Sequence, residues 1–242
     1  MSSLEIRNLV AGYGSVTVLH GVSMDVPEGA IVALLGTNGN GKSTLIKSIL
    51  GIVRARSGAI VLGRAGKQYP LHEMSPQQIV ELGVAIVPEG RRLFSGMTVR
   101  ENLLLGCYHK SERGLAERGL DYVFATFPIL AERSKQDVGT MSGGQQQMVA
   151  IGRALMSEPK LLLIDEPSVG LAPNIVKQTI EQVKELRDNR GLTVLMAEQS
   201  FHQAVAVADK AYVLAHGEIA MQGDDMERFG SDDAVRSVYL GV

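Results

Sequence analysis

The organisation of this chain follows from one segment, Ala30-Ile31-Val32-Ala33-Leu34-Leu35-Gly36-Thr37-Asn38-Gly39-Asn40-Gly41-Lys42-Ser43. Its first part, Ala30 to Leu35, is a continuous apolar run, as expected of a strand that is buried on both faces of a sheet. The residues that follow, Thr44 to Leu50, have helical character and end at Gly51. The sequence therefore predicts a buried strand, a glycine-rich turn and a helix in direct succession.

The glycine-rich turn has the pattern of a phosphate-binding loop (P-loop), with Gly36, Gly41, Lys42 and Ser43 at the fixed positions. In such a loop backbone N–H groups wrap the phosphates, the lysine reaches the β- and γ-phosphates, and the hydroxyl binds Mg²⁺. A glycine turn without a ligand is the alternative, which the flanking strand and helix disfavour. We expect ATP to be bound by Gly36, Thr37, Asn38, Gly39, Asn40, Gly41, Lys42, Ser43 and Thr44.

A second apolar run, Leu161 to Ile164, ends in two carboxylates, Asp165 and Glu166. Acidic residues after strands are common, and by itself this pattern indicates only a polar turn. In a chain that already has a P-loop, it predicts that Asp165 holds Mg²⁺ and that Glu166 orients and deprotonates an attacking water.

The segment Ser142-Gly143-Gly144-Gln145 predicts a helix that begins with an open N-terminus. Ser142 and Gln145 have the spacing of a capping box, and apolar residues recur at helical spacing until Pro159 ends the helix. With two glycines there, unpaired N–H groups and the positive end of the helix dipole point outward, which suits a phosphate. On these residues alone, a capped helix after a glycine turn explains the pattern equally well.

Strand and helix patterns alternate along most of the chain. Strands are predicted at 4–10, 16–26, 58–63, 84–87, 161–164, 193–197, 211–214 and 218–221, and helices at 145–157, 173–189 and 200–209. Between Gly90 and Pro159 the pattern is helical, which indicates an insertion. We expect one domain over 1–242, with a mostly parallel, helix-covered sheet in a core at about 1–89 and 160–242 and a helical subdomain at 90–159.

Composition excludes several classes of function. The chain has 242 residues, 45% of them hydrophobic, and its net charge of −2 gives no basic signature for nucleic acid. Its one cysteine, Cys107, excludes an intramolecular disulfide, fits a reducing compartment and lies in an apolar run, where a buried side chain is expected. The five histidines lack metal-ligand spacing. Because no signal region or long apolar span is present, we expect a soluble, cytoplasmic protein.

Taken together, the P-loop, the Ser-Gly-Gly-Gln segment and the Asp-Glu strand end resemble the ATP-binding-cassette (ABC) ATPases in order and spacing, over essentially the whole chain. The resemblance implies an α/β P-loop NTPase fold of the ABC type, with a mostly parallel core sheet, an N-terminal antiparallel β subdomain and an inserted helical subdomain. It also implies ATP and Mg²⁺ as ligands and a head-to-tail pair of ATPase subunits. In that pair Ser142, Gly143, Gly144 and Gln145, the signature segment, would contact the partner's ATP, and Tyr13 matches the aromatic residue that stacks on adenine.

The chain departs from the common family pattern near its own nucleotide. Glu89 stands where a glutamine usually touches Mg²⁺ and the attacking water, and Gln199 stands where a histidine usually contacts the γ-phosphate. The segment Ser168 to Pro173 lacks the usual aspartate, and Met141 replaces a commoner leucine. Since a carboxylate only accepts hydrogen bonds and a glutamine carries no charge, we hypothesise that this site turns over more slowly than its partner's.

These departures, with Val235 to Gly241, resemble the smaller ATPase of high-affinity branched-chain amino acid importers; related urea or amide importers are the alternative. The resemblance implies a second ATPase (a heterodimer, or a homodimer in isolation), two membrane-spanning permease subunits and an external binding protein. The chain would then lie at the cytoplasmic face of the plasma membrane, with Phe94 or Met97 exposed toward a permease helix.

Other classes fit less well. A non-transport ABC ATPase usually joins two cassettes or carries a long coiled coil, and the interval from Lys42 to Asp165 is too short for one. A P-loop kinase or GTPase has no use for the signature segment. Exporter cassettes are commonly fused to their membrane helices.

Overall fold

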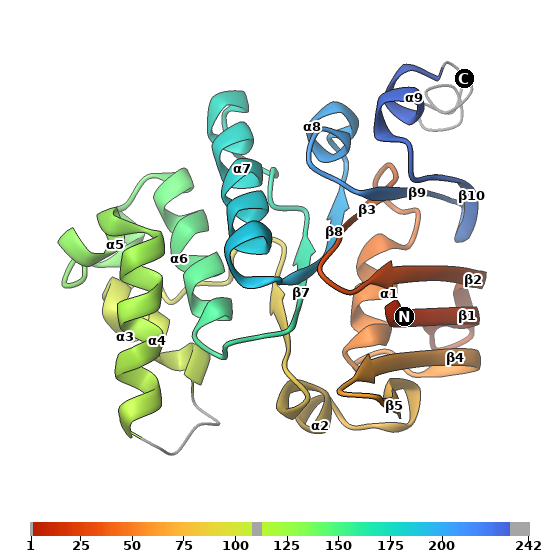
Figure 1. The fold of residues 1–242 in the computed structure, drawn as a ribbon, viewed down its shortest axis with the longest axis horizontal. Helices are drawn as coiled ribbons and strands as arrows, with labels where there is room; N and C mark the ends of the chain where they lie inside the picture. The colour runs from red at the N-terminus through yellow and green to blue at the C-terminus, as the bar shows by residue number, and fades with distance from the viewer. Residues whose placement is uncertain (1, 108–112, 233–242) are drawn as a thin grey trace.

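The computed structural model describes residues 2–107 and 113–232 and contains two sheets (Figure 1). The first sheet is four-stranded and antiparallel, in the order β2-β1-β4-β5. Its strands are β1 (Ser2–Tyr13), β2 (Val16–Pro27), β4 (Ala55–Arg64) and β5 (Lys67–Pro70).

The second sheet is six-stranded, in the order β10-β9-β3-β8-β7-β6, and is parallel except for the antiparallel pair of β9 and β10. Its strands are β3 (Ile31–Leu35), β6 (Val84–Val87), β7 (Leu161–Asp165), β8 (Thr193–Glu198), β9 (Lys210–Ala215) and β10 (Glu218–Gly223). The mostly parallel core sheet and the N-terminal antiparallel sheet that the sequence predicted are confirmed.

Helices cover both sheets, and those between β6 and β7 gather on the side of the molecule away from the antiparallel sheet (Figure 1). This group comprises α3 (Val99–Leu104), α4 (Arg113–Thr126), α5 (Pro128–Glu132) and α6 (Gly143–Leu155). The others are α1 (Lys42–Ile49), α2 (Pro76–Glu81), α7 (Pro173–Arg190), α8 (Phe201–Val205) and α9 (Met226–Ser231), and short 3₁₀ turns lie at Leu71–Glu73, Leu105–Cys107 and Val138–Thr140. The division into a core and a helical subdomain at 90–159 stays a prediction.

Strand β3 lies between two hydrophobic cores, which explains its unbroken apolar sequence. Ile31, Ala33 and Leu35 face the core shared with α6 and α7, whereas Val32 and Leu34 face the core shared with α1 and the antiparallel sheet. All five side chains are fully buried. Alternate residues of a strand point to opposite faces, so an apolar residue is needed at every position.

Some element boundaries differ from the sequence predictions. Strand β5 has the sequence Lys-Gln-Tyr-Pro, which lacks an apolar alternation, and it was not predicted. Helix α8 ends at Val205 rather than at Asp209. Asp209 instead accepts a hydrogen bond from the Ile31 backbone N–H (2.8 Å) and forms an ion pair with Arg187 (2.9 Å), and these contacts fix the start of β9. Cys107 is buried, as predicted. The segment Val235 to Gly241 lies outside the described residues.

Among the described residues no helix has the length and apolar character needed to cross a bilayer.

One buried hydroxyl joins the two sheets. Tyr212 of β9 is fully buried, accepts a hydrogen bond from the Asp25 backbone of β2 (3.1 Å) and donates one to the Asp25 carboxylate (2.9 Å). Tyr212→Phe removes both bonds, and we expect the free energy of unfolding to fall by about 1–2 kcal/mol, measured by urea denaturation. Tyr69→Phe serves as the control, because Tyr69 is a half-buried tyrosine whose hydroxyl has no hydrogen-bond partner in the described part of the chain. Equal stability of the two variants would contradict the inter-sheet role.

Candidate active site

The P-loop connects β3 to α1 and has a backbone that only glycine accommodates. Gly39 and Gly41 have φ angles of 86° and 102°, in the left-handed region. A Cβ at Gly36 would lie 2.6 Å from the Leu214 carbonyl oxygen, so a side chain there would displace β9. The loop shape is therefore set by its glycines, as the sequence predicted for a phosphate-binding turn.

The loop is also held by its Asn40 side chain. Asn40 Nδ2 donates to Thr37 Oγ1 (2.8 Å), and Asn40 Oδ1 accepts from the backbone N–H of His216 (3.0 Å), in the turn between β9 and β10. Sequence reasoning treated Asn40 only as a phosphate-binding position and missed this restraint. The two hydrogen bonds tie the loop to its own Thr37 and to the turn between β9 and β10.

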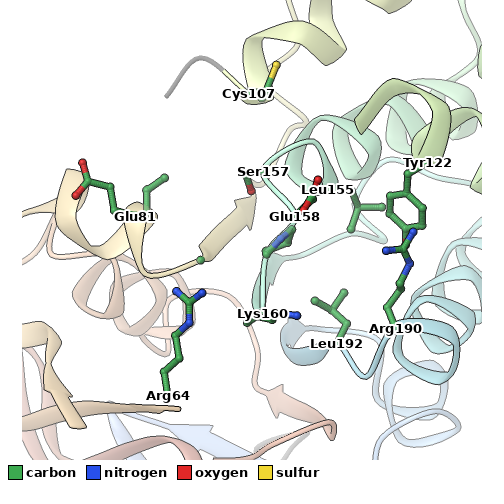
Figure 2. A pocket seen from close by; sticks show the side chains of 14 residues that line it. Arg64, Glu81, Cys107, Tyr122, Leu155, Ser157, Glu158, Lys160, Arg190 and Leu192 are labelled. Atoms are coloured by element: carbon green, nitrogen blue, oxygen red, sulfur yellow. The ribbon is translucent and has the colours of Figure 1, made fainter. Parts of the chain in front are cut away.

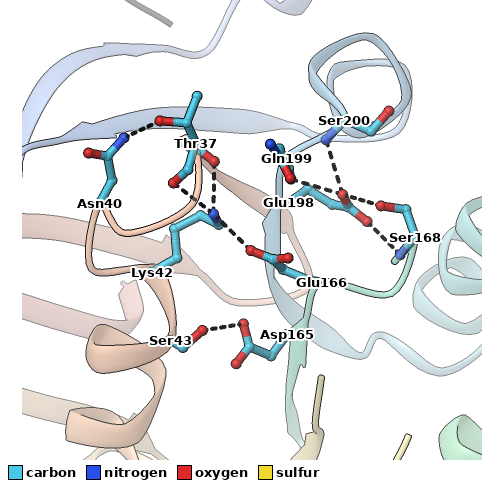
Figure 3. Close-up of polar contacts among 11 residues, drawn as sticks. Thr37, Asn40, Lys42, Ser43, Asp165, Glu166, Ser168, Glu198, Gln199 and Ser200 are labelled. Carbon is cyan, nitrogen blue, oxygen red and sulfur yellow. Dashed lines mark hydrogen bonds and ion pairs between the residues drawn. The ribbon is translucent and has the colours of Figure 1, made fainter. Parts of the chain in front are cut away.

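Lys42 and Glu166 form a buried ion pair at the centre of the site (Figure 3). Lys42 Nζ lies 2.9 Å from Glu166 Oε1, and the two side chains are 3% and 7% exposed. The same ammonium donates to the carbonyl oxygens of Gly36 (2.8 Å) and Thr37 (3.2 Å). Glu166 adopts a left-handed backbone (φ 49°), which costs energy in a non-glycine residue and is typical of functional sites.

Ser43 and Asp165 form the second contact between the P-loop and the end of β7, with Ser43 Oγ donating to Asp165 Oδ1 over 3.1 Å. Burial raises the pKa of the Asp165 carboxyl above its ordinary 3.8, the Ser43 hydrogen bond opposes this, and the charges of Glu166 and Glu89 raise it further. A cation beside this carboxylate would offset the cost of its burial.

These oxygens fit Mg²⁺. No group of three or more His, Cys, Asp or Glu side chains in the described ranges could hold a metal. Mg²⁺ is usually bound by one or two carboxylates together with substrate phosphates and waters rather than by a complete protein cage. The hydroxyl of Ser43 and the carboxylate of Asp165 supply such a partial set.

Glu89 joins this group. It is exposed, and with Lys42, Ser43 and Glu166 it lines a hollow of about 300 Å³ over the P-loop. Gln199 directly follows β8 and is exposed. Its side chain lies on the side of Lys42 and Glu166 (Figure 3). Tyr13 is 47% exposed and lies beside α1, with Lys47 Nζ 6.0 Å from its ring centroid.

The signature segment forms the predicted capping box at the start of α6. Ser142 Oγ accepts from Gln145 N (3.3 Å), and Gln145 Oε1 accepts from Ser142 N (3.1 Å). Gly143 is half-exposed, whereas Gly144 is buried, and a Cβ there would lie 2.6 Å from Ile175 of α7. Gly144 is therefore required by helix packing as well. Helices α6 and α1 stand on opposite sides of β7 (Figure 1), so this N-terminus lies away from the chain's own P-loop.

A second hollow, of about 460 Å³, lies at the amino ends of β6, β7 and β8, opposite the edge that carries the P-loop (Figure 2). Its lining includes Arg64, Lys160 and Arg190, and Arg190 stacks on the Tyr122 ring at 3.7 Å. It contains none of the predicted site residues.

On the helical side, Phe94 is 56% exposed and Met97 is half-buried, so the predicted exposure of Phe94 is confirmed.

Sequence reasoning also missed Glu198, which is fully buried at the end of β8 and accepts hydrogen bonds from two loops. Its only signal was a carboxylate directly after an apolar strand, the pattern that identified Asp165.

Comparisons with known proteins agree with this geometry. The family model described as ABC transporter matches residues 19–169. The chain is 47% identical to the high-affinity branched-chain amino acid transport ATP-binding protein BraG of Pseudomonas aeruginosa, over 95% of each chain. It is 34% identical to the probable branched-chain amino acid transport ATP-binding protein LivF of Archaeoglobus fulgidus, over 91% of each. The crystal structure of the ADP conformation of an ABC transporter's ATP-binding cassette superposes with a TM-score of 0.87 at 29% identity, over the whole of both chains.

The raised pKa of Asp165 has a consequence for stability. Between pH 3.8 and the higher pKa of the folded state, the native chain binds more protons than the unfolded chain, so its stability falls as pH rises through this window. Without Mg²⁺ at pH 7, Asp165→Asn removes the buried charge, and we expect Tm to rise by about 2–4 °C, the effect of about 1 kcal/mol in a protein of this size. Differential scanning calorimetry at pH 7 and near pH 4 checks this, because the gain vanishes toward pH 3.8.

In the same variant, stabilisation by Mg²⁺ with ATP is expected to be lost. The exposed Asp121→Asn is the control for removing one negative charge. A lower Tm for Asp165→Asn than for the unchanged chain at pH 7 would contradict the burial cost.

Proposed function

The chain belongs to the ABC transporter family as an ATP-binding, ATP-hydrolysing subunit, and we propose that it powers an importer of branched-chain amino acids. The observation that carries this proposal is the full-length similarity to BraG and LivF, two proteins of branched-chain amino acid transport, in a chain that also has a complete P-loop site. No residue of this site is expected to touch the transported molecule, so specificity would belong to the other subunits.

In the proposed site, the phosphates of ATP lie in the P-loop, with N–H groups of residues 36–44 as donors and the Tyr13 ring as a platform for adenine. Ser43 and Asp165 would hold Mg²⁺, with Glu89 close by. When bound, Mg²⁺ would supply positive charge to the β- and γ-phosphate oxygens. Gln199 would donate a hydrogen bond to the γ-phosphate.

The buried ion pair gives Lys42 two alternative partners. In the structure its ammonium is held by Glu166 and two loop carbonyls. The γ-phosphate carries more negative charge than the Glu166 carboxylate. It would therefore attract Lys42 and leave Glu166 without its counter-charge. Glu166 would then be able to accept a proton from the attacking water. We propose that nucleotide binding in this way activates the base that acts on the nucleotide.

The signature segment would complete the ATP site of a second ATPase subunit. The capping box occupies the N–H groups of Ser142 and Gln145, whereas the N–H of the half-exposed Gly143 has no acceptor within the helix, and this end of α6 lies at a distance from the chain's own P-loop. A head-to-tail pair places each such N-terminus over the other subunit's nucleotide. We propose a heterodimer beneath two permease subunits at the cytoplasmic face of the membrane, supplied by an external binding protein, with Phe94 in the permease contact.

Glu166→Gln tests the proposed base. We expect kcat for ATP hydrolysis by the isolated chain, in which both sites of a homodimer carry the change, to fall by about 10²–10⁴-fold, the range for loss of general-base catalysis. The Kd for ATP is expected to stay equal or to decrease, because the neutral amide no longer competes for Lys42. Lys42→Ala, the matched change in the other partner of the pair, is expected to lose ATP binding. Unchanged hydrolysis by a homodimer of Glu166→Gln chains would exclude Glu166 as the base.

The same change also tests whether the two sites are unequal, as Glu89 and Gln199 suggest. In the assembled transporter, Glu166→Gln is expected to reduce transport less than the equivalent change in the partner ATPase. If the change here abolishes transport and the partner's change leaves it intact, the hypothesis of a slower site in this chain is wrong.

Uptake measurements test the substrate. Deleting the gene is expected to reduce uptake of radiolabelled leucine, isoleucine and valine, and restoring the chain is expected to recover it, whereas the Lys42→Ala chain is not. Radiolabelled urea and acetamide are measured in parallel. Loss of urea or amide uptake with normal leucine uptake would overturn the branched-chain assignment in favour of the related importers.

A further inference from the structure

Glu198, the last residue of β8, is a fully buried carboxylate that accepts four hydrogen bonds (Figure 3). Its Oε1 accepts from the Ser168 backbone N–H (3.0 Å), and its Oε2 accepts from the Ser168 hydroxyl (2.8 Å). Oε2 also accepts from the backbone N–H groups of Gln199 (3.0 Å) and Ser200 (3.1 Å). One side chain therefore binds two loops that are separated by α7 in the sequence.

The chemistry of these contacts requires a carboxylate. Three of the four donors are backbone N–H groups, which can only donate, and they occupy both oxygens. Burial raises the pKa of Glu198 above its ordinary value, and the hydrogen bonds from Ser168, Ser200 and Gln199 offset part of this rise. An ionised carboxylate is the side chain that accepts at both oxygens, and charge-assisted hydrogen bonds of this kind are stronger than neutral ones.

The two loops lead to different ends of the ATPase unit. One carries Gln199, beside the P-loop of this chain. The other, residues 168–171, runs to the start of α6: the Leu171 side chain lies 3.2 Å from where a Cβ of Gly143 would be. Arg91 reinforces this contact, because its guanidinium lies within 3.5 Å of the Val169 carbonyl and 3.3 Å of Gln147 Oε1 on α6.

We propose that Glu198 is a positioning residue that makes the Gln199 loop and the 168–171 segment move as one unit. Through it, occupancy of this chain's own ATP site sets the position of the signature end of α6, which serves the partner's ATP. This inference rests on the proposed placement of ATP against the P-loop and Gln199. Glu198 itself does not touch the nucleotide.

Glu198→Gln removes part of this contact. An amide has one acceptor and one donor end, so its NH₂ group faces either the Ser168 N–H or the N–H groups of Gln199 and Ser200, and those N–H groups lose their acceptor. The change preserves size and burial. Thr193→Val is the matched control: Thr193 lies at the other end of β8, is also buried, and its Oγ1 accepts from the Gly29 N–H (3.0 Å).

The experiment uses the full chain with Mg²⁺-ATP and measures kcat, KM and backbone amide hydrogen exchange. For Glu198→Gln we expect kcat to fall about tenfold, the factor for about 1.4 kcal/mol lost at a buried hydrogen bond, with KM for ATP within about threefold. Nucleotide is expected to protect residues 36–44 in every variant, but to protect residues 168–171 less in Glu198→Gln than in the chains that keep Glu198. Thr193→Val is expected to keep kcat within about twofold, whatever its loss of Tm.

Three outcomes overturn the inference. The first is an equal loss of kcat in Thr193→Val and Glu198→Gln at equal Tm, which would make the role of Glu198 purely structural. The second is nucleotide-dependent protection of residues 168–171 in Glu198→Gln that equals the unchanged chain. The third is a lack of nucleotide-dependent protection of residues 36–44 in the unchanged chain, which would overturn the ATP placement itself and this inference with it.

Discussion

The register of three adjacent parallel strands governs the rest of this structure. Leu35 of β3 pairs with Glu198 of β8, and Ala197 of β8 pairs with Asp165 of β7. All three strands end at the same edge, so the segments that follow them meet there regardless of their distance in the sequence. Loops at the carboxyl ends of parallel strands are the usual place for ligands in such sheets. The apolar faces of β3, buried in two cores, hold this register in place.

A dense set of buried charges follows from that register. Lys42, Asp165, Glu166 and Glu198 are all less than a tenth exposed, and each has a partner in the structure. Isolated buried charges are costly, so such a set persists only where every member is paired. The negative charges exceed the one lysine in number, which leaves the site short of positive charge and suited to a ligand that brings a cation with its phosphates.

Much of this could be predicted from the sequence, because the relevant signals are local. The apolar run before Gly36, the glycines of the loop and the Ser142–Gln145 spacing each report on structure within a few residues. The edge strand β5 could not be predicted, since its pairing with β4 rather than its own residues makes it a strand.

Long-range contacts were equally hidden. The Lys42–Glu166 pair, the support of Asn40 by His216 and the joining of two loops by Glu198 all depend on which strands are neighbours. The sequence located the residues beside these contacts and gave no indication of the contacts themselves.

The restraint on Asn40 links the nucleotide loop to the late part of the chain. Asn40 and His216 are 176 positions apart, and Gly36 abuts the Leu214 carbonyl oxygen. During synthesis the P-loop leaves the ribosome early, but its final shape requires β9 and the turn after it. An emerging chain would thus carry the complete motif long before it could bind nucleotide firmly. ATP binding would then require that the whole sheet has assembled. Hydrolysis would therefore begin only after folding is complete.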